Sequence, residues 1–300
     1  MKERFTTHAE TKNTFDRRQF VAALGLLTSA TALMPSPAHA GWPVQSSCLR
    51  VRADGTPYRV PGKVASLYQK AAIIFDGKQE TMVLNSLYSG EGDLFGCFGP
   101  IHAGAETKPT SRALFDELDR QTDMPSFSNA RTGDDADRLH ARHEDIYNLE
   151  ILRSMQDIQN WFSRNGFGMT DKKKSVFEYY LDDRKTPFFA ALLSYGYPCQ
   201  GTMVNVWTQP VQSVFPSDHI WFPMKSTTAA DGDFSFVSFD LLTKGHPVDI
   251  PGHFDTKFKG RFELGHQTYN LTRLEGRLSM KQMDQDLDLK VVESSKLTAW

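Results

Sequence analysis

The clearest pattern of apolar and polar positions in the chain predicts a β-hairpin. Two apolar runs, residues 71–75 (AAIIF) and 81–84 (TMVL), flank the turn Asp76-Gly77-Lys78. Asp-Gly between apolar runs favours a tight turn, because both residues tolerate the positive φ angles that such turns need. We therefore expect two antiparallel strands joined near Gly77.

Most other apolar segments are also typical of strands. Alternation of apolar and polar residues at 234–239 (FSFVSF) has the period of an extended segment. Turn residues such as Asp231-Gly232-Asp233 recur at a spacing of roughly ten residues, as they do in antiparallel sheets and sandwiches. The expected strands are 95–101, 147–152, 188–195, 202–208, 220–225, 234–242, 257–264, 269–278 and 287–292.

Two helices are predicted in the middle of the chain. Ser154 can cap the first, in which apolar residues recur at helical spacing until Asn165-Gly166 ends it. Thr170 can cap the second, and its Lys172-Lys173-Lys174 is expected to form a solvated face. A shorter helix is expected over 112–120.

These elements together predict an α+β fold. We expect residues 41–300 to form a single domain with an antiparallel β-sheet or sandwich core and a helical pair in its middle. Residues 122–145 are expected to form an exposed loop, because their first part is rich in Pro, Gly, Ser, Asn and Asp. Residues 186–217 carry no charge, but prolines and polar residues interrupt them, so no transmembrane span of about 20 apolar residues is predicted.

Residues 1–40 have the features of an export signal of the twin-arginine type. Arg17-Arg18 precede the apolar residues 21–34, and Ala38 and Ala40 stand two apart after them. A charged start, a short apolar region and small residues before the cut make up a cleaved signal peptide, and paired arginines point to the twin-arginine route. We expect cleavage after Ala40 and a periplasmic protein. The alternatives are an ordinary secretory signal or a membrane anchor, for which the apolar region is short.

The charge balance gives no sign of a polyanionic partner. The chain has 34 Lys and Arg against 36 Asp and Glu. Removing the five bases and three acids of residues 1–40 leaves a net charge of −4, which offers nucleic acid no attraction. We expect no nucleic-acid partner, and an envelope protein is one candidate partner.

Three cysteines, Cys48, Cys97 and Cys199, allow one disulfide and leave one thiol. In an oxidising compartment we expect a Cys97–Cys199 disulfide, because both lie in strand-rich segments whereas Cys48 lies on an expected tail. A buried or a reactive Cys97 thiol is the alternative.

Several stretches, taken in order, resemble an uncharacterised exported bacterial family, the one catalogued as domain of unknown function 2330. They are AAIIFDG at 71–77, LEIL at 149–152 with WFSRNGF at 161–167, FFAA at 188–191, IWFPMK at 220–225, and LTRL at 271–274 followed by Met283 and Asp286. The chain departs from the family at Cys48-Leu49-Arg50, where Cys-Gly is usual. The resemblance implies export and a common fold, and the family has no established activity.

Histidines supply the candidate metal ligands. His140 and His143 stand three apart beside Glu144, which is not the spacing of the zinc peptidase pattern. A looser group, His246, His253 and His266, lies among turn residues and would supply a base or a metal ligand. Polar residues on exposed segments are the alternative interpretation of both groups.

No other pattern points to a catalytic centre or a cofactor. The chain has no G-x-S-x-G, no Gly-rich phosphate loop and no Rossmann glycine pattern. Arg273, Glu275 and Arg277 alternate along one expected strand and would form either a structural row of ion pairs or an anion site. We expect pairing with acids.

These observations favour an exported binding or envelope-associated module without catalytic activity and without a cofactor. The alternative is a metal-dependent or hydrolytic periplasmic enzyme that uses the histidines of the 246–266 region. Convergence of two histidines and an acid at a pocket would favour the enzyme.

Overall fold

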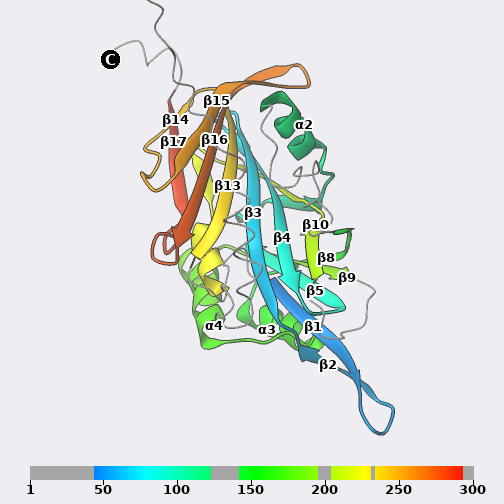
Figure 1. Ribbon diagram of the computed structural model, residues 1–300. Helices are drawn as coiled ribbons and strands as arrows, with labels where there is room; N and C mark the ends of the chain where they lie inside the picture. The colour runs from blue at the N-terminus through cyan, green and yellow to red at the C-terminus, as the bar shows by residue number, and fades with distance from the viewer. Residues whose placement is uncertain (1–43, 123–141, 195–203, 231–233, 293–300) are drawn as a thin grey trace, which may run out of the picture. The chain divides into compact units, whose positions relative to one another are not determined.

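The computed structural model describes residues 44–122, 142–194, 204–230 and 234–292, most of which lie in strands (Figure 1). The contacts group Ala38–Trp300 into one compact unit. The strands are β1 (Val44–Val51), β2 (Pro57–Pro61), β3 (Val64–Phe75), β4 (Gln79–Gly90), β5 (Leu94–Pro100), β6 (Glu106–Pro109), β7 (Arg142–Glu144), β8 (Ile146–Leu152), β9 (Phe188–Ser194), β10 (Val204–Thr208), β11 (Val211–Pro216), β12 (Ile220–Phe222), β13 (Phe234–Thr243), β14 (His246–Val248), β15 (Asp255–Leu264), β16 (Gln267–Ser279) and β17 (Leu287–Val292). The helices are α2 (Ala113–Thr122), α3 (Met155–Arg164), α4 (Asp171–Glu178), the π-helix η3 (Tyr179–Asp183) and the 3-10 helix η4 (Met224–Ala229).

The strands form three sheets. The largest has the order β15-β16-β13-β3-β4-β10-β7, and β11 pairs with β4 and β6 beside this path. The second sheet has the order β2-β1-β5-β9-β8, and the third has the order β12-β17-β14. The protein is therefore β-rich with few helices, as expected from the strand-like segments.

The largest sheet is mixed, whereas an antiparallel sheet was expected. β13 pairs parallel with β3, so that Val237 lies opposite Gln69. β10 also pairs parallel with β7. Turn residues indicate pairing only between consecutive strands, so they give no information about a pairing between strands this far apart in the sequence.

The predicted hairpin is present as β3 and β4. Phe75 lies opposite Glu80, and Gly77 has a φ of 95°, which glycine adopts without strain. The Asp76 carboxylate accepts hydrogen bonds from the backbone N–H groups of Lys78 and Gln79, both at 2.9 Å. The bond from Lys78 in particular lowers the pKa of Asp76, so the turn holds an ionised carboxylate.

The helical pair is also present, with the predicted caps. The Ser154 hydroxyl accepts from Asp157 N at 3.1 Å, and the Thr170 hydroxyl accepts from Lys173 N at 3.3 Å. The prediction of a solvated face for the triple lysine is wrong at its central residue. Lys173 is buried, and its Nζ donates to Gln45 Oε1 at 3.0 Å.

The region around Cys48 is a strand, contrary to the expectation of a tail. β1 pairs with both β2 and β5, and Cys48 is only 2% exposed. In the first half of β1, the side chains of Gln45, Ser46 and Ser47 are also buried. An apolar periodicity cannot reveal a strand whose buried residues are polar.

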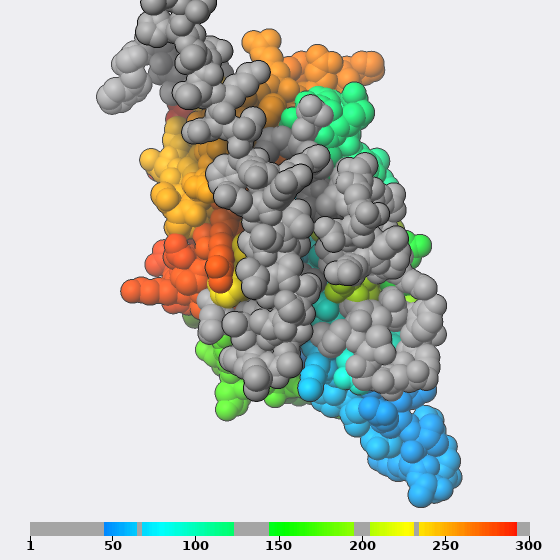
Figure 2. Space-filling view, in the orientation of Figure 1, coloured from blue at the N-terminus to red at the C-terminus, as the bar shows by residue number. Residues whose placement is uncertain are grey.

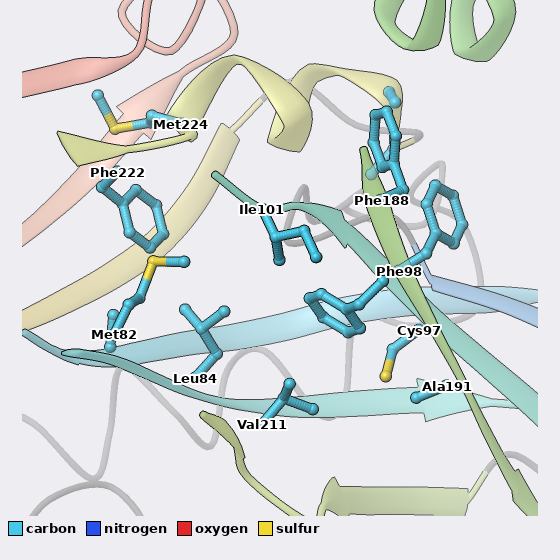
Figure 3. Close-up of a cluster of buried hydrophobic side chains, with 14 of the residues drawn as sticks. Met82, Leu84, Cys97, Phe98, Ile101, Phe188, Ala191, Val211, Phe222 and Met224 are labelled. Atoms are coloured by element: carbon cyan, nitrogen blue, oxygen red, sulfur yellow. The ribbon is translucent and has the colours of Figure 1, made fainter. Parts of the chain in front are cut away.

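The main core lies between the largest sheet and the second sheet. Figure 3 shows Met82 and Phe222, from β4 and β12, in one cluster with Phe98 and Phe188, from β5 and β9. The aromatic side chains of α3 pack closely on β5 at Gly96, where an added Cβ would lie 2.6 Å from Trp161. Only glycine therefore fits this position of β5.

A second, smaller core lies on the opposite face of the largest sheet. Ala72 of β3 belongs to it, whereas its neighbours Ala71 and Ile73 belong to the main core. Phe115 and Leu118 of α2 cover this face. Within the described ranges, no helix has the length and apolarity needed to cross a membrane.

Candidate functional site

A polar cavity of about 630 Å³ opens where several loops and strand ends meet. Lys78 comes from the β3–β4 turn, Arg184 follows η3, and Trp221 belongs to β12. The other lining residues are His102, Asp183, Thr186, Pro216, Ser217, Asp218 and His219. The volume lies within the range of about 300–1,000 Å³ that ligand pockets usually have.

Two of these loops are tied together by a backbone hydrogen bond. Ser217 N donates to the carbonyl oxygen of Lys78 at 3.0 Å, so the β3–β4 turn and the β11–β12 loop keep their spacing. The Ser217 hydroxyl donates to the carbonyl oxygen of His219 at 2.5 Å. The hydroxyl is thus engaged within its own turn, and the turn presents its side chains to the cavity in a fixed arrangement.

Asp286 forms a buried hub behind the cavity wall. Its carboxylate accepts from Trp221 Nε1 at 3.2 Å and from Lys225 N at 3.2 Å. Tyr180 donates its hydroxyl to the same carboxylate, and Arg184 Nη2 lies 3.6 Å from it. Burial raises the pKa of Asp286, and the hydrogen bond from Tyr180 opposes that rise. The hub fixes both Trp221 and Arg184 at the wall.

Glu80 is a second buried carboxyl group beside Trp221. Its Oε2 accepts from Trp221 N at 2.8 Å, and its side chain is fully buried. Within the described residues, Oε1 has no hydrogen-bond partner. Burial raises the pKa of Glu80 well above its usual range, and repulsion from Asp288 adds to that rise. Glu80 therefore favours its neutral form.

His219 lies between two carboxylates at the rim. Its Nδ1 lies 2.5 Å from Asp218 Oδ1, and its Nε2 lies 3.2 Å from Asp288 Oδ1. The hydrogen bond to His219 lowers the pKa of the exposed Asp218. Both ring nitrogens face acids, so neither is directed at a bound molecule.

His102 also lines the cavity and comes from the segment that follows β5. Its ring stacks on Phe215, with centroids 4.9 Å apart and planes within 5°. Its Nδ1 lies 2.8 Å from the carbonyl oxygen of Ala103. Nε2 is the ring nitrogen left for a ligand.

The histidines singled out in the sequence lie on separate elements wherever the structure describes them. His246 lies on β14, His253 precedes β15, and His266 lies in the β15–β16 turn. His253 Nε2 is buried without a partner in the described part of the chain, and burial lowers the pKa of His253. His143 lies on β7, and His140 lies outside the described residues. Across the described ranges, no three His, Cys, Asp or Glu side chains converge as metal ligands would.

Arg273 pairs with acids, as predicted, and one of them, Asp240, lies directly opposite it on the neighbouring strand β13. Its Nε lies 2.5 Å from Asp240 Oδ1, and its Nη2 lies 3.4 Å from Asp119 Oδ1. Lys70 Nζ also contacts Asp119, at 2.9 Å. All four of these side chains are buried between α2, which carries Asp119, and the strands beneath it, where they form a charge cluster. Arg277 lies instead over the ring of Phe234, 3.7 Å from its centroid.

The cysteine prediction was wrong for Cys97. Cys97 is a free, buried thiol, and burial raises its pKa to about 12. Cys48 is disulfide-bonded. The third cysteine, Cys199, lies outside the described residues.

Comparison of the chain with family models, curated proteins and solved structures found no match. The site must therefore be interpreted from its own geometry. In the sequence, Trp221 and Lys225 lie close together, but Asp286 lies far along the chain, and no spacing relates it to them. The structure brings these three residues together.

Proposed function

We propose that this protein is an exported binding module, and that its cavity holds a small ligand through a carboxylate or phosphate group. The observation that carries the proposal is the pair of bases at the cavity, Lys78 and Arg184, set on walls that buried hydrogen bonds hold in place. Pre-organised walls favour binding, because less conformational freedom is lost when the ligand arrives.

The charged residues of the cavity lining are two bases, Lys78 and Arg184, and two acids, Asp183 and Asp218, so an anionic group would be held by direct contact with the bases and not by a net positive charge. Asp218 is engaged by His219, and Asp286 accepts four hydrogen bonds or ion contacts from the wall. Arg184 directs Nη2 at Asp286, and a guanidinium has five N–H donors, so others remain for a ligand. In the described residues Lys78 has no ion-pair partner, and its ammonium group adds a second donor.

The same contacts support binding without catalysis. Acyl transfer would need a hydroxyl that a base can deprotonate, but the Ser217 hydroxyl is bonded within its turn. Of the two histidines in the lining, His219 is a poor general base because both its ring nitrogens face carboxylates, so His102 Nε2 is the histidine nitrogen at the lining that a ligand can meet. We class the fold as α+β. Several stretches resemble, in their order along the chain, the uncharacterised exported family, and this resemblance supports a periplasmic location.

Titration calorimetry with inorganic phosphate and with a small dicarboxylate tests the cavity directly. We expect binding of at least one of these probes, weakened about tenfold in Lys78→Gln and in Arg184→Gln, since a charged hydrogen bond is worth about 1.5–3 kcal/mol. Lys281→Gln, an exposed lysine that does not line the cavity, is the matched control. Equal affinity in all four proteins would refute the cavity as the site.

Export by the twin-arginine route has its own test. Changing Arg17 and Arg18 to lysine should abolish export, because that route needs the paired guanidinium groups while the general secretory route accepts any positive charge. Intact mass of periplasmic material should show a chain that begins at Gly41. Undiminished export of the double-lysine variant would end the twin-arginine hypothesis.

A further inference from the structure

A second cavity, of about 320 Å³, lies at the edge of the largest sheet, where β15 is the outermost strand. Its walls come from β15, from the neighbouring β16, and from β14 with the loop that follows it. In Figure 1, β14 and β15 lie close together, and Figure 2 shows yellow and orange atoms of this part of the chain at the surface. Among the described residues, the two cavities share no lining residue, so this is a separate site from the cavity beside Trp221.

The charged side chains of this second cavity are all bases, and we call it the basic cavity. Lys259 and Arg261 line it from β15, and His246 lines it from β14. No Asp or Glu is present among the described residues that line it. The cavity beside Trp221, in contrast, has two acids in its lining. An anionic group in the basic cavity would therefore be attracted by the bases without repulsion from a carboxylate at the wall.

The two bases of β15 are also free of acidic partners. Both are exposed, and in the part of the chain that the structure describes neither Lys259 nor Arg261 forms an ion pair. The acids nearest in the sequence, Asp249, Asp255 and Glu263, do not line the cavity. Asp255 pairs instead with another lysine of β15, at 3.0 Å. The positive charges of the basic cavity are therefore not neutralised within the chain.

Strand geometry places the two bases side by side. Lys259 and Arg261 are two residues apart in β15, so both project from one face, at a spacing of about 6.6 Å along the strand. On β16, Thr272 lies opposite Lys259 and Asn270 lies opposite Arg261, so these polar side chains share that face. Two cationic groups and the amide of Asn270 therefore border the same space.

The opposite wall is held in place through Gly245. Asn270 Nδ2 donates to the carbonyl oxygen of Gly245 at 3.1 Å, and Thr243 Oγ1 donates to the same oxygen at 2.5 Å. His246 follows this glycine and lies opposite Val292 of β17. The turn that carries His246 is thus tied to β16, which favours binding because the wall is already ordered. The second N–H of the Asn270 amide remains as a donor for a ligand.

The basic cavity also has an apolar wall. Pro247 and Ile250 line it, and both are half-buried. Ile250 packs on the main core, so its position is fixed. An inorganic anion would leave these side chains in contact with water, whereas a ligand with an organic part would cover them. The lining therefore favours an anion that carries a small apolar body.

The number of unpaired bases indicates the class of anion. A carboxylate or a sulfate ester carries one negative charge, whereas a phosphate monoester carries about 1.5–2 near neutral pH. Two adjacent unpaired bases match the phosphate. A long polyanion is disfavoured, because residues 41–300 have a net charge of −4 and would repel the rest of it.

We propose that the basic cavity binds a small phosphate monoester, with the phosphate at Lys259 and Arg261 and the organic part against Pro247 and Ile250. The planar guanidinium can bind two phosphate oxygens at once, and the lysine adds a compact positive charge. This site goes beyond the function proposed for the cavity beside Trp221 and does not depend on it.

Titration calorimetry with phenyl phosphate tests the proposal in the chain from Ala38 onward, which forms a compact unit. The titration uses the Lys78→Gln/Arg184→Gln variant, so that binding in the cavity beside Trp221 does not contribute; if that cavity binds no anion, the result is the same. We expect phenyl phosphate to bind several-fold more tightly than inorganic phosphate, because its ring covers the apolar wall. Adding Lys259→Gln/Arg261→Gln should weaken the binding at least about tenfold.

A matched variant and a matched probe serve as controls. Arg153→Gln/Lys281→Gln removes one arginine and one lysine from exposed positions outside the basic cavity. It should bind phenyl phosphate like its parent, and all variants should melt alike, since exposed bases stabilise little. Phenyl sulfate, which has a similar shape and one charge, should bind several-fold more weakly than phenyl phosphate. The proposal is overturned if phenyl phosphate does not bind, if the control variant weakens binding equally, or if phenyl sulfate binds as tightly.

Discussion

The charge cluster beneath α2 and the cavity beside Trp221 use the same kinds of side chains in opposite ways. Beneath α2, Lys70, Asp119, Asp240 and Arg273 balance two positive charges with two negative ones, and each is at most 6% exposed. At the cavity, Arg184 has a buried acid behind it and solvent in front, and its side chain is 39% exposed. Charged side chains that are buried and fully paired stabilise the fold, whereas charged side chains that keep unused hydrogen-bond donors at a cavity can bind a ligand.

This difference separates the charge cluster from the cavity as a candidate anion site. The sequence pattern directed attention to Arg273, but the structure shows that its donors are taken by Asp240, Asp119 and Thr122. The sequence pattern did not indicate the cavity residues, because most of them lie in turns or at the ends of elements, where the composition is ordinary. The predictions below test whether the two clusters differ as described.

The largest effect is expected from Arg273→Ala. Removing one partner from a buried ion-pair cluster leaves an unpaired charge and typically costs about 3–5 kcal/mol. For a domain of this size, thermal unfolding should shift down by roughly 6–20 °C. Arg277→Ala, in the same strand but exposed over Phe234, should shift it by far less. Equal melting of Arg273→Ala and the parent would mean that the cluster is not structural.

The second effect concerns Glu80, whose folded-state pKa is raised by burial. A carboxyl group with a raised pKa stabilises the fold below its unfolded pKa, and that contribution is lost as the pH rises through the folded pKa. Glu80→Gln keeps an acceptor for Trp221 N and carries no charge. We expect it to melt at least about 3 °C higher than the parent at pH 8, with a smaller gain at pH 5.

Glu178→Gln changes a half-exposed acid on α4, serves as the control for Glu80 and should show no such pH dependence. Melting curves at several pH values decide the matter. A loss of stability at pH 8 in Glu80→Gln would show that the ionised carboxylate is used in the folded protein.

The smallest effect is expected for chemical labelling of the cysteines in the native protein. Burial raises the pKa of Cys97 to about 12, so its thiolate is scarce at neutral pH and its sulfur is inaccessible. Native protein should leave Cys97 unlabelled by iodoacetamide, and unfolding without reductant should expose it. Peptide mapping should recover Cys48 in a disulfide. Rapid native labelling of Cys97 would contradict a closed core.

Local rules predicted much of this fold. The Asp76-Gly77 turn and the caps Ser154 and Thr170 were found because each effect depends on neighbouring residues alone. Segment β1 was missed because its inward positions include Gln45 and Ser47, and their burial depends on partners far along the chain. The parallel pairing of β13 with β3 was missed for the same reason.

The cavity could not be predicted from the sequence. Its lining comes from the β3–β4 turn, the segment after β5, the end of η3 and the β11–β12 loop, and no spacing relates these segments. The buried Lys173 shows the same limit, because a triple lysine indicates a solvated face unless a distant acceptor such as Gln45 Oε1 is present. Both the cavity lining and the burial of Lys173 depend on contacts between residues far apart in the sequence.

The most direct test of the central claim measures stability and anion affinity together in Arg273→Ala and Lys78→Gln. We predict that Arg273→Ala lowers the melting temperature and, below its transition, binds phosphate or the dicarboxylate as the parent does. Lys78→Gln should melt like the parent and bind the same probe about tenfold more weakly. If Arg273→Ala loses the binding and Lys78→Gln keeps it, the anion site lies beneath α2 and the account of the cavity is wrong.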